Sequence, residues 1–427
     1  MLKKNLRKRL SYLLPFAGGG AQPKLDLNFT AGPVDPLITF TRASEATVFG
    51  GDGLMYVAAA DKPRIDYDPA TGECLGLLLE EARTNALTRS EEFDHSDWAK
   101  LNLNTTGMAD VAVAPDGNTT ADQLIEDGTT NGFWMARSQS FVSGTTYTFS
   151  AFYKDKTGDR FPELVFPIAA FTTYIIANFN LSTGACTISG AGTCAMKDVG
   201  NGWWRCSMTA TATATNSASI QLRITNSYTT YAPTYAGNNA SGVYVWGAQF
   251  EEGAFPTSYI PTVASTATRA ADVASITGTN FSSWFNASEG TVFIDVRSSS
   301  TATPISHTLS DGTFNESIYG NFVSGTSYRG ANVLDAGAGQ AASIPTFTGI
   351  VQSVGIRDAF AYKLNDFAEA LNGSAAVTDT SGTLPTVNRL YLGSNWAGNG
   401  NYLCGHIKRF TYYDTRLPNT TLREITA

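Results

Sequence analysis

Apolar and polar residues alternate in short runs between about residue 86 and residue 262. In SIQLRI this period places Ile220, Leu222 and Ile224 on one side of an extended chain. In VYVWGAQF it predicts a second apolar face made of Tyr244, Trp246, Ala248 and Phe250. Alternation with a period of two indicates strands with one buried side. Turn-forming residues about every ten positions favour a sandwich of antiparallel strands.

A second region with the same character covers residues 285–427, where EGTVFIDVR, NRLYLGS and GHIKRFTYY are the clearest strands. LPNTTLREIT at the end of the chain predicts a short helix or turn. Residues 24–85 show short strands and turn clusters and are interpreted as a β-rich connector, and residues 263–284 as a linker with two prolines just before it. The predicted fold class is all-β: two antiparallel β-sandwiches, the first at residues 86–262, after a short N-terminal basic helix and the connector.

The first 23 residues carry the one strongly basic stretch of the chain. The leucines recur at helical spacing and leave a cationic face that includes Arg7; they are Leu2, Leu6, Leu10 and Leu13. Gly18, Gly19 and Gly20 then supply a flexible joint. Two interpretations stay open: a solvated terminus, or a peptide that docks its leucines onto a partner subunit. A cleaved secretory signal is less favoured, because the apolar part is short and interrupted by Pro15.

The amino-acid composition and net charge argue against some classes of function. Hydrophobic residues make up 43% of the 427 residues, enough for packed cores, and charged residues only 15%. A net charge of −8 argues against nucleic-acid binding. No apolar run is long enough to span a membrane. The sequence therefore predicts a protein that binds neither nucleic acid nor the membrane interior.

Metal and cofactor chemistry has little support. The five cysteines form no CxxC pair and there are only three histidines, so we expect no metal site and no cofactor. Cys186 and Cys194 flank the glycine-rich stretch TISGAGT, where a hairpin would bring them together. The odd number of cysteines and their sparse use favour small buried thiols over a disulfide at this position.

Catalytic motifs are missing as well: the chain has no GxSxG elbow, HExxH or phosphate-binding loop. Adjacent acids occur as Glu80-Glu81, Glu91-Glu92 and Glu251-Glu252. Neighbours along a strand point to opposite faces, so such doublets do not form the facing pair that a glycosidase needs. We expect no enzymatic activity.

Sugar recognition requires only aromatic rings to stack on pyranose faces and polar side chains to bind hydroxyls. The loop SNWAGNGNY offers Trp396 and Tyr402 together with Asn395 and Asn399. A second candidate group lies in NSYTTYAPTYAGNN, which contains Tyr231 and Tyr235. The alternative is that these aromatic residues cap the sandwiches or pack against a neighbouring subunit.

Several longer motifs resemble those of a known group. ITFTRAS, LLLEEARTN and FPTSYIPT, followed by STATRAADV, are similar to the N-terminal module and jelly roll of tailed-phage and gene-transfer-agent virion proteins. In that group the jelly roll resembles family 4/9 carbohydrate-binding modules. The region from EGTVFIDVR to HIKRFTYYDTRLPNTTL looks like a concanavalin A/laminin-G-like sandwich.

The resemblance implies a virion appendage, a head spike fibre or tail fibre, that is often trimeric and contacts host-surface polysaccharide. It brings no catalytic residues. Its partners would be other virion subunits, bound through the N-terminus, and a host glycan. Two alternative hypotheses for the function remain: a structural decoration or adaptor protein that binds only virion subunits, and a capsule-degrading enzyme.

Overall fold

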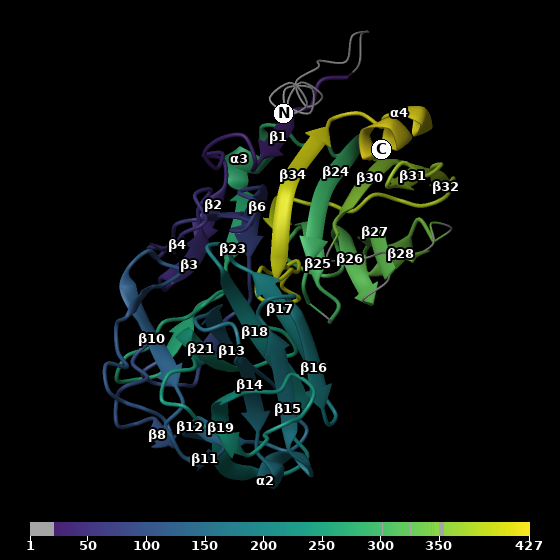
Figure 1. Cartoon of the computed structure of the whole chain (residues 1–427). Helices are drawn as coiled ribbons and strands as arrows, with labels where there is room; N and C mark the ends of the chain where they lie inside the picture. The colour runs from purple at the N-terminus through teal and green to yellow at the C-terminus, as the bar shows by residue number, and fades with distance from the viewer. Residues whose placement is uncertain (1–20, 301, 325–326, 343, 345, 350–353) are drawn as a thin grey trace.

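The computed structural model describes residues 21–427 apart from positions 301, 325–326, 343, 345 and 350–353, and it consists of two β-sandwiches (Figure 1). All pairings between the strands described are antiparallel, and the helices are short. The predicted all-β fold with two antiparallel sandwiches is therefore confirmed. The expected N-terminal basic helix, with Leu2, Leu6, Arg7, Leu10 and Leu13, lies outside the described residues.

The first sandwich pairs two six-stranded sheets. One sheet has the order β17 (Thr193–Asp198), β18 (Trp203–Thr211), β13 (Thr146–Asp155), β21 (Gly242–Glu252), β10 (Thr119–Ile125), β9 (Ala112–Val113). The other has the order β16 (Ala185–Ser189), β15 (Ile175–Asn180), β14 (Phe161–Phe166), β19 (Asn216–Thr225), β12 (Phe133–Phe141), β8 (Ala99–Leu101). The pair β11 (Thr130–Asn131) and β20 (Tyr235–Ala236) and the helix α2 (Ile168–Phe171) lie between these strands in the chain.

The core between these sheets confirms the alternation predicted for β19: Ile220, Leu222 and Ile224 are at most 2% exposed. The single apolar face predicted for VYVWGAQF is wrong. Gly247 adopts a φ of 60° where the register of β21 against β13 shifts, and the inserted residue turns the strand over. Ala248 and Phe250 enter the sandwich core, whereas Trp246 packs on the outer side of the sheet.

The second sandwich is built from two eight-stranded sheets. The first has the order β32 (Val377–Asp379), β31 (Asp366–Leu371), β30 (Ile356–Lys363), β24 (Glu289–Ser298), β34 (Gly405–Tyr413), β6 (Cys74–Leu79), β5 (Arg64–Tyr67), with β1 (Leu25–Asn28) also on β34. The second has the order β2 (Thr39–Thr41), β23 (Val273–Thr277), β33 (Arg389–Leu392), β25 (Ile305–Ser310), β26 (Ser317–Ser324), β27 (Ser327–Asp335), β28 (Ala338–Gln340), with β29 (Phe347–Thr348) also on β27.

Strand pairing places the expected connector and linker differently from the sequence prediction. From residues 24–85, β1, β5 and β6 join one sheet of the second sandwich and β2 joins the other. The hairpin β3 (Ala46–Phe49) and β4 (Met55–Ala58) stays outside these sheets. The segment 263–284 contains β22 (Ala267–Arg269), β23 and the helix α3 (Gly278–Ser282). The first sandwich is thus inserted between the two parts of the chain that form the second.

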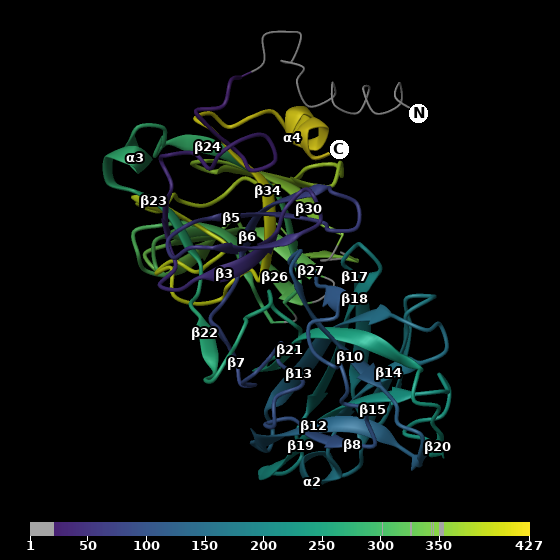
Figure 2. The same cartoon turned by 60° about the vertical axis from the view of Figure 1, so that its left-hand side comes forward.

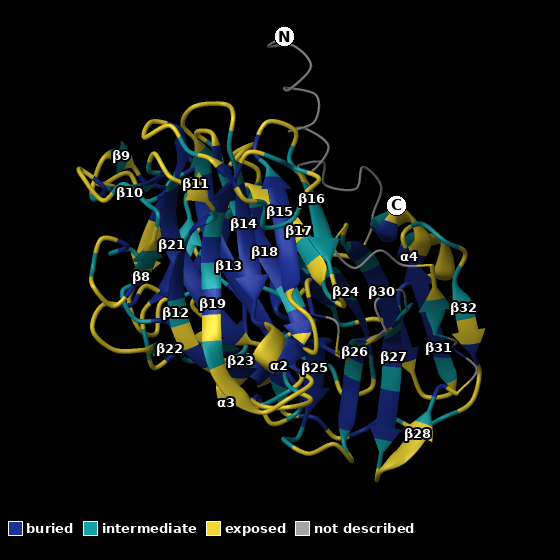
Figure 3. Cartoon of the chain, turned by 60° about the horizontal axis from the view of Figure 1, so that its bottom comes forward, coloured by how far each residue is buried: buried dark blue, intermediate teal, exposed yellow. Residues whose placement is uncertain are grey.

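The expected C-terminal helix is present as α4 (Asn419–Thr426). Leu417 and Leu422 pack against a small-residue patch on the outer side of β30 and β31, formed by Ala359, Ala361, Ala368 and Ala370. Figure 3 shows the buried strands of both sandwiches in dark blue and their exposed connecting loops in yellow. No helix in the part of the chain that the structure describes has the length and apolar character needed to cross a membrane.

Cys186 and Cys194 form a disulfide, so the preference for two thiols is wrong. Cys186 belongs to β16 and Cys194 to β17, which are edge strands of the two opposing sheets of the first sandwich. The short glycine-rich turn between them brings the two edges together and places the sulfur atoms within bonding distance. Cys74, Cys206 and Cys404 are free, and the last two are buried.

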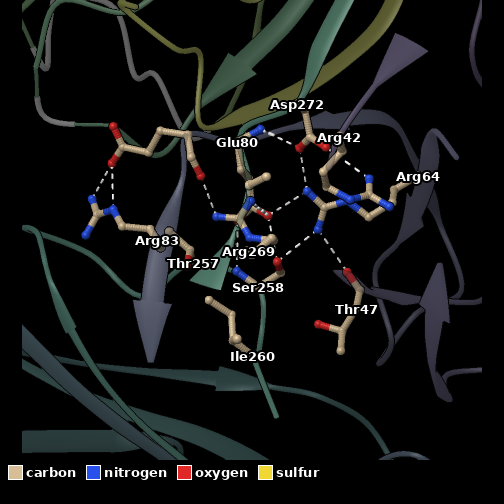
Figure 4. A network of polar contacts seen from close by, with 12 residues as sticks. Arg42, Thr47, Arg64, Glu80, Arg83, Thr257, Ser258, Ile260, Arg269 and Asp272 are labelled. Atoms are coloured by element: carbon tan, nitrogen blue, oxygen red, sulfur yellow. Dashed lines mark hydrogen bonds and ion pairs between the residues drawn. The ribbon is translucent and has the colours of Figure 1, made fainter. Parts of the chain in front are cut away.

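The two sandwiches are joined by a buried network of charged residues (Figure 4). The Asp272 carboxylate binds Arg42 at 3.0 Å and Arg64 at 2.6 Å, and Glu80 binds Arg64 at 2.8 Å and Arg269 at 3.0 Å. Burial favours the neutral form of Glu80, but Arg269 and Arg64 outweigh it and hold the pKa of this carboxyl well below its usual range.

Ser258, which follows the last strand of the first sandwich, donates its backbone N–H and its hydroxyl to Glu80 at 2.8 and 2.6 Å. The motifs ITFTRAS, PRIDY, LLLEEARTN, FPTSYIPT and TRAADV each supply a member of this network: Arg42, Arg64, Glu80, Ser258, Arg269 and Asp272. The junction between the sandwiches therefore explains the residue types at these six positions.

Candidate functional site

An aromatic cluster lies on the outer face of the second sandwich. The Trp396 ring is centred 4.7 Å from Phe314 and 6.3 Å from Tyr319. Phe314 is 39% exposed, and Trp396 and Tyr319 are partly exposed. Tyr319 follows the core residue Ile318 on β26, so its side chain points away from the core. The three rings present apolar surface to solvent in one place.

The loop that carries Trp396 is fixed to the sheet beneath it. Thr308 and Ser310 on the outer side of β25 donate their hydroxyls to the carbonyls of Ser394 at 2.9 Å and Trp396 at 3.1 Å. Gly398 has a φ of 71°, and a Cβ there would lie 2.5 Å from the Tyr391 ring. A larger residue would push the loop off the sheet. Glycine is therefore required here, because the positive φ disfavours other residues and because the Tyr391 ring leaves no room for a Cβ atom.

Asn395 organises the loop from within. It is 8% exposed, and its Oδ1 accepts the backbone N–H groups of Ala397 and Asn399, each at 3.1 Å. Its Nδ2 donates to Asn399 Oδ1 at 3.2 Å. Asn399 is exposed. Asn395 therefore positions Trp396, whereas Asn399 has polar surface available to a ligand.

Polar side chains continue from the aromatic cluster along the same face of the sheet. Asn332 on β27 donates to Asn321 Oδ1 at 2.8 Å and to the Tyr319 carbonyl at 3.2 Å. Burial raises the pKa of the Tyr319 hydroxyl, and nearby Arg329 opposes that rise. Aromatic faces next to amide and guanidinium groups suit a sugar, which has apolar ring faces and hydroxyls at its edges.

The structure brings together Trp396, Asn395 and Asn399 from the predicted sugar-binding residues and adds Phe314 and Tyr319, which the sequence analysis missed. Phe314 lies in the turn SDGTFNES between two strands. An aromatic residue in such a polar turn is the feature of the sequence that could have indicated a binding residue here. Tyr402 belongs to another environment. Its pKa is raised by burial and by the carboxylate of Glu81, beside the junction of the sandwiches.

Tyr231 and Tyr235 lie in the first sandwich. Tyr235 is 8% exposed, and its hydroxyl donates to Glu126 Oε2 at 2.9 Å. Arg160 binds both oxygens of Glu126 at 2.6 Å, and the Tyr235 ring packs 4.8 Å from Phe133. Tyr235 is therefore held within the protein, while Tyr231 is partly exposed in the loop before it.

This loop, residues 226–234, lies over polar residues of the sheet below. Glu163 Oε1 accepts the Ala232 N–H at 2.9 Å, and Asn178 Nδ2 donates to the carbonyls of Ser227 and Tyr228 at 3.3 and 3.2 Å. Both side chains are fully buried, and Glu163 Oε2 and Asn178 Oδ1 have no hydrogen-bond partner among the described residues. Burial raises the pKa of Glu163 to about 7.

Acidic residues do not meet in an accessible cleft among the residues described. Glu80 and Glu251 are buried with their own polar partners, and Glu81 pairs with Arg83. Asp358 and Glu369 approach one another inside the second sandwich, and each is 0% exposed. Burial raises the pKa of both carboxyls, that of Asp358 to about 7. Within the described ranges, no group of three or more metal-ligating side chains is present.

Comparisons with known proteins give weak similarities. No protein-family model matches the chain, and no curated protein matches it. The CBM40 module of the Ruminococcus gnavus sialidase, solved with α2,3-sialyllactose, is 16% identical with a TM-score of 0.29, over 33% of this chain and 84% of that one.

Two laminin structures are similar to this chain, also with low sequence identity and low TM-scores. The LG1–3 region of the laminin α2 chain is 10% identical with a TM-score of 0.23, over 67% of this chain and 66% of that one. Domains LG4–5 of the mouse laminin α1 chain are 11% identical with a TM-score of 0.21, over 67% of this chain and 85% of that one. Similarity this low does not identify a ligand.

Proposed function

We propose that this protein is a non-enzymatic appendage of a phage-type particle and binds host-surface polysaccharide through the aromatic cluster of Phe314, Tyr319 and Trp396. The observation that carries the binding part is this partly exposed cluster with polar neighbours on a fixed loop. The virion part rests on the sequence motifs ITFTRAS, LLLEEARTN and FPTSYIPT, which resemble those of virion proteins.

The mechanism is polyvalent attachment. A single site of this kind stacks one or two sugar rings and binds weakly, since aromatic contacts contribute about 0.5–1.5 kcal/mol each. A trimer displayed in many copies on a particle would combine such contacts into strong adhesion. In this proposal residues 1–23, with the stripe Leu2, Leu6, Leu10 and Leu13 next to Arg7, dock into another virion subunit.

Replacing Trp396 with alanine tests the binding part. We expect about a 3- to 10-fold weaker affinity for host polysaccharide, because one stacking ring is lost. Tyr174→Ala is the matched control, because Tyr174 is 47% exposed but belongs to the first sandwich. Affinity and unfolding temperature would be measured for both variants. Equal affinity of Trp396→Ala and the unmodified chain, with both folded, would refute the proposed site.

Three further experiments test the remaining parts of the proposal. Deleting residues 1–20 should leave a folded protein that is absent from purified particles, and normal incorporation would contradict the docking role. Incubation with host polysaccharide should leave its chain length unchanged, whereas shortened chains would show an enzyme. A glycan array without any hit would favour a structural adaptor that binds only virion subunits.

A further inference from the structure

A groove of about 1010 Å³ lies at one edge of the first sandwich, on the side of the junction. Its walls come from β12, from the start of β13 and the end of β21, and from the strand pair β7 (Arg83–Asn85) and β22. Figure 2 shows β7 and β22 side by side, next to the first sandwich. The volume is at the upper end of the range for small-molecule sites, about 300–1,000 Å³.

Two stacked aromatic rings lie beneath the floor of the groove, next to one amide that lines it. Tyr147 and Phe250 stack with centroids 5.2 Å apart and an interplanar angle of 6°, and each is 2% exposed. Gln139 is 9% exposed and lines the groove. Among the residues that the structure describes, its carboxamide has no hydrogen-bond partner.

The amide of Gln139 is open to the groove. Neither polar atom of this amide belongs to the buried side-chain atoms that lack a partner in the described part of the chain, so the amide is in contact with the solvent of the groove. Gln139 faces inward between the sheets, like Phe133, Met135 and Phe141 on the same strand. Its amide therefore reaches the interior end of the groove, where a ligand or water is the available partner.

The walls are rich in hydroxyl groups and carry little unpaired charge. Thr145 and Ser138 make no side-chain hydrogen bond within the described part of the chain. The guanidinium groups present are already neutralised: Arg83 pairs with Glu81, and Arg137 binds Asp97 at 3.1 Å. The exposed Glu252 is left as an additional acceptor.

We propose that this groove binds a short segment of a neutral glycan. Hydroxyls and an amide with both donors and acceptors complement sugar hydroxyls, which also act as both. Among the described residues that line the groove, both arginines are paired, which leaves no free cation to favour an anionic ligand. The site belongs to the first sandwich and is independent of the aromatic cluster around Trp396.

The test uses the full chain with the Trp396→Ala substitution, which weakens binding at the aromatic cluster, and the groove variants below distinguish the two sites. The probes are neutral oligosaccharides of two to six hexose units and, for comparison, sialyllactose and short acidic and basic peptides. Calorimetric titration would measure the affinity for each. We expect neutral oligosaccharides to bind and the charged probes and peptides to bind more weakly.

Two substitutions then locate the binding. Gln139→Leu keeps the packing volume and removes the amide, so we expect about a tenfold weaker affinity. Ser138→Trp, at an exposed groove position, should block binding, and Thr193→Trp on the exposed edge strand β17 should not. Thermal unfolding confirms that each variant is folded. Absence of any oligosaccharide binding, preferential peptide binding, or unchanged affinity in both groove variants would overturn the proposal.

Discussion

Replacing Glu163 with glutamine should stabilise the protein at neutral and alkaline pH and leave its stability nearly unchanged at pH 4. Glu163 is fully buried under the 226–234 loop, where one carboxyl oxygen accepts the Ala232 N–H and the other has no partner within the described part of the chain. Burial raises its pKa from the ordinary value of 4.5 to about 7. The folded protein thus retains this proton over a pH range in which the unfolded chain has lost it.

The size of the expected change in unfolding free energy follows from the two pKa values of Glu163, 4.5 in the unfolded chain and about 7 in the folded protein. Below pH 4.5 the carboxyl is protonated in both states, so it contributes no pH dependence. Between pH 4.5 and 7 the unfolded chain is ionised and the folded protein is not, so the stability of the unmodified protein falls as pH rises. Above pH 7 the full difference is reached, about 3 kcal/mol for this shift. Glutamine keeps an acceptor for Ala232 and has no proton to lose.

The assay is urea denaturation of the unmodified protein and of Glu163→Gln at pH 4, 6 and 8. We expect the difference in unfolding free energy to be close to zero at pH 4 and to grow to about 3 kcal/mol at pH 8. Other buried acids, such as Asp122, change the pH dependence of both proteins equally and cancel in the comparison. Glu45→Gln, at an exposed position, is the control. A difference that does not change with pH would refute the reasoning.

Two other predictions concern stability. Replacing Cys186 and Cys194 with serine should lower the unfolding free energy by about 2–3 kcal/mol, since the bond closes a short loop between two sheet edges. Denaturation with and without a reductant checks this, and a reductant effect in the variant would contradict it. Glu80→Ala should cost about 3–5 kcal/mol by leaving Arg64 and Arg269 with an incomplete set of buried partners. Glu73→Ala removes an exposed ion pair with Lys408 and should cost under about 1 kcal/mol; calorimetry showing equal losses would argue against the junction network.

The candidate site could be predicted only in part. Trp396 and the asparagines around it belong to one short segment, so their proximity follows from the sequence. Phe314 and Tyr319 are about eighty residues away and reach Trp396 only because β26 and β33 both pair with β25. Tyr235 looked equally suitable in the sequence, but the fold buries its hydroxyl against Glu126.

The sequence by itself determined the local structure. Alternation in β19, the C-terminal helix and the turn-rich breaks reflect interactions within a few residues, and these predict an all-β protein with two sandwiches. Tertiary structure alone decided that β1, β2, β5 and β6 complete the second sandwich, that Gly247 turns β21 over, and that Cys186 meets Cys194. Strand partners and register depend on which distant segments bury each other's apolar faces, and no local pattern contains that information.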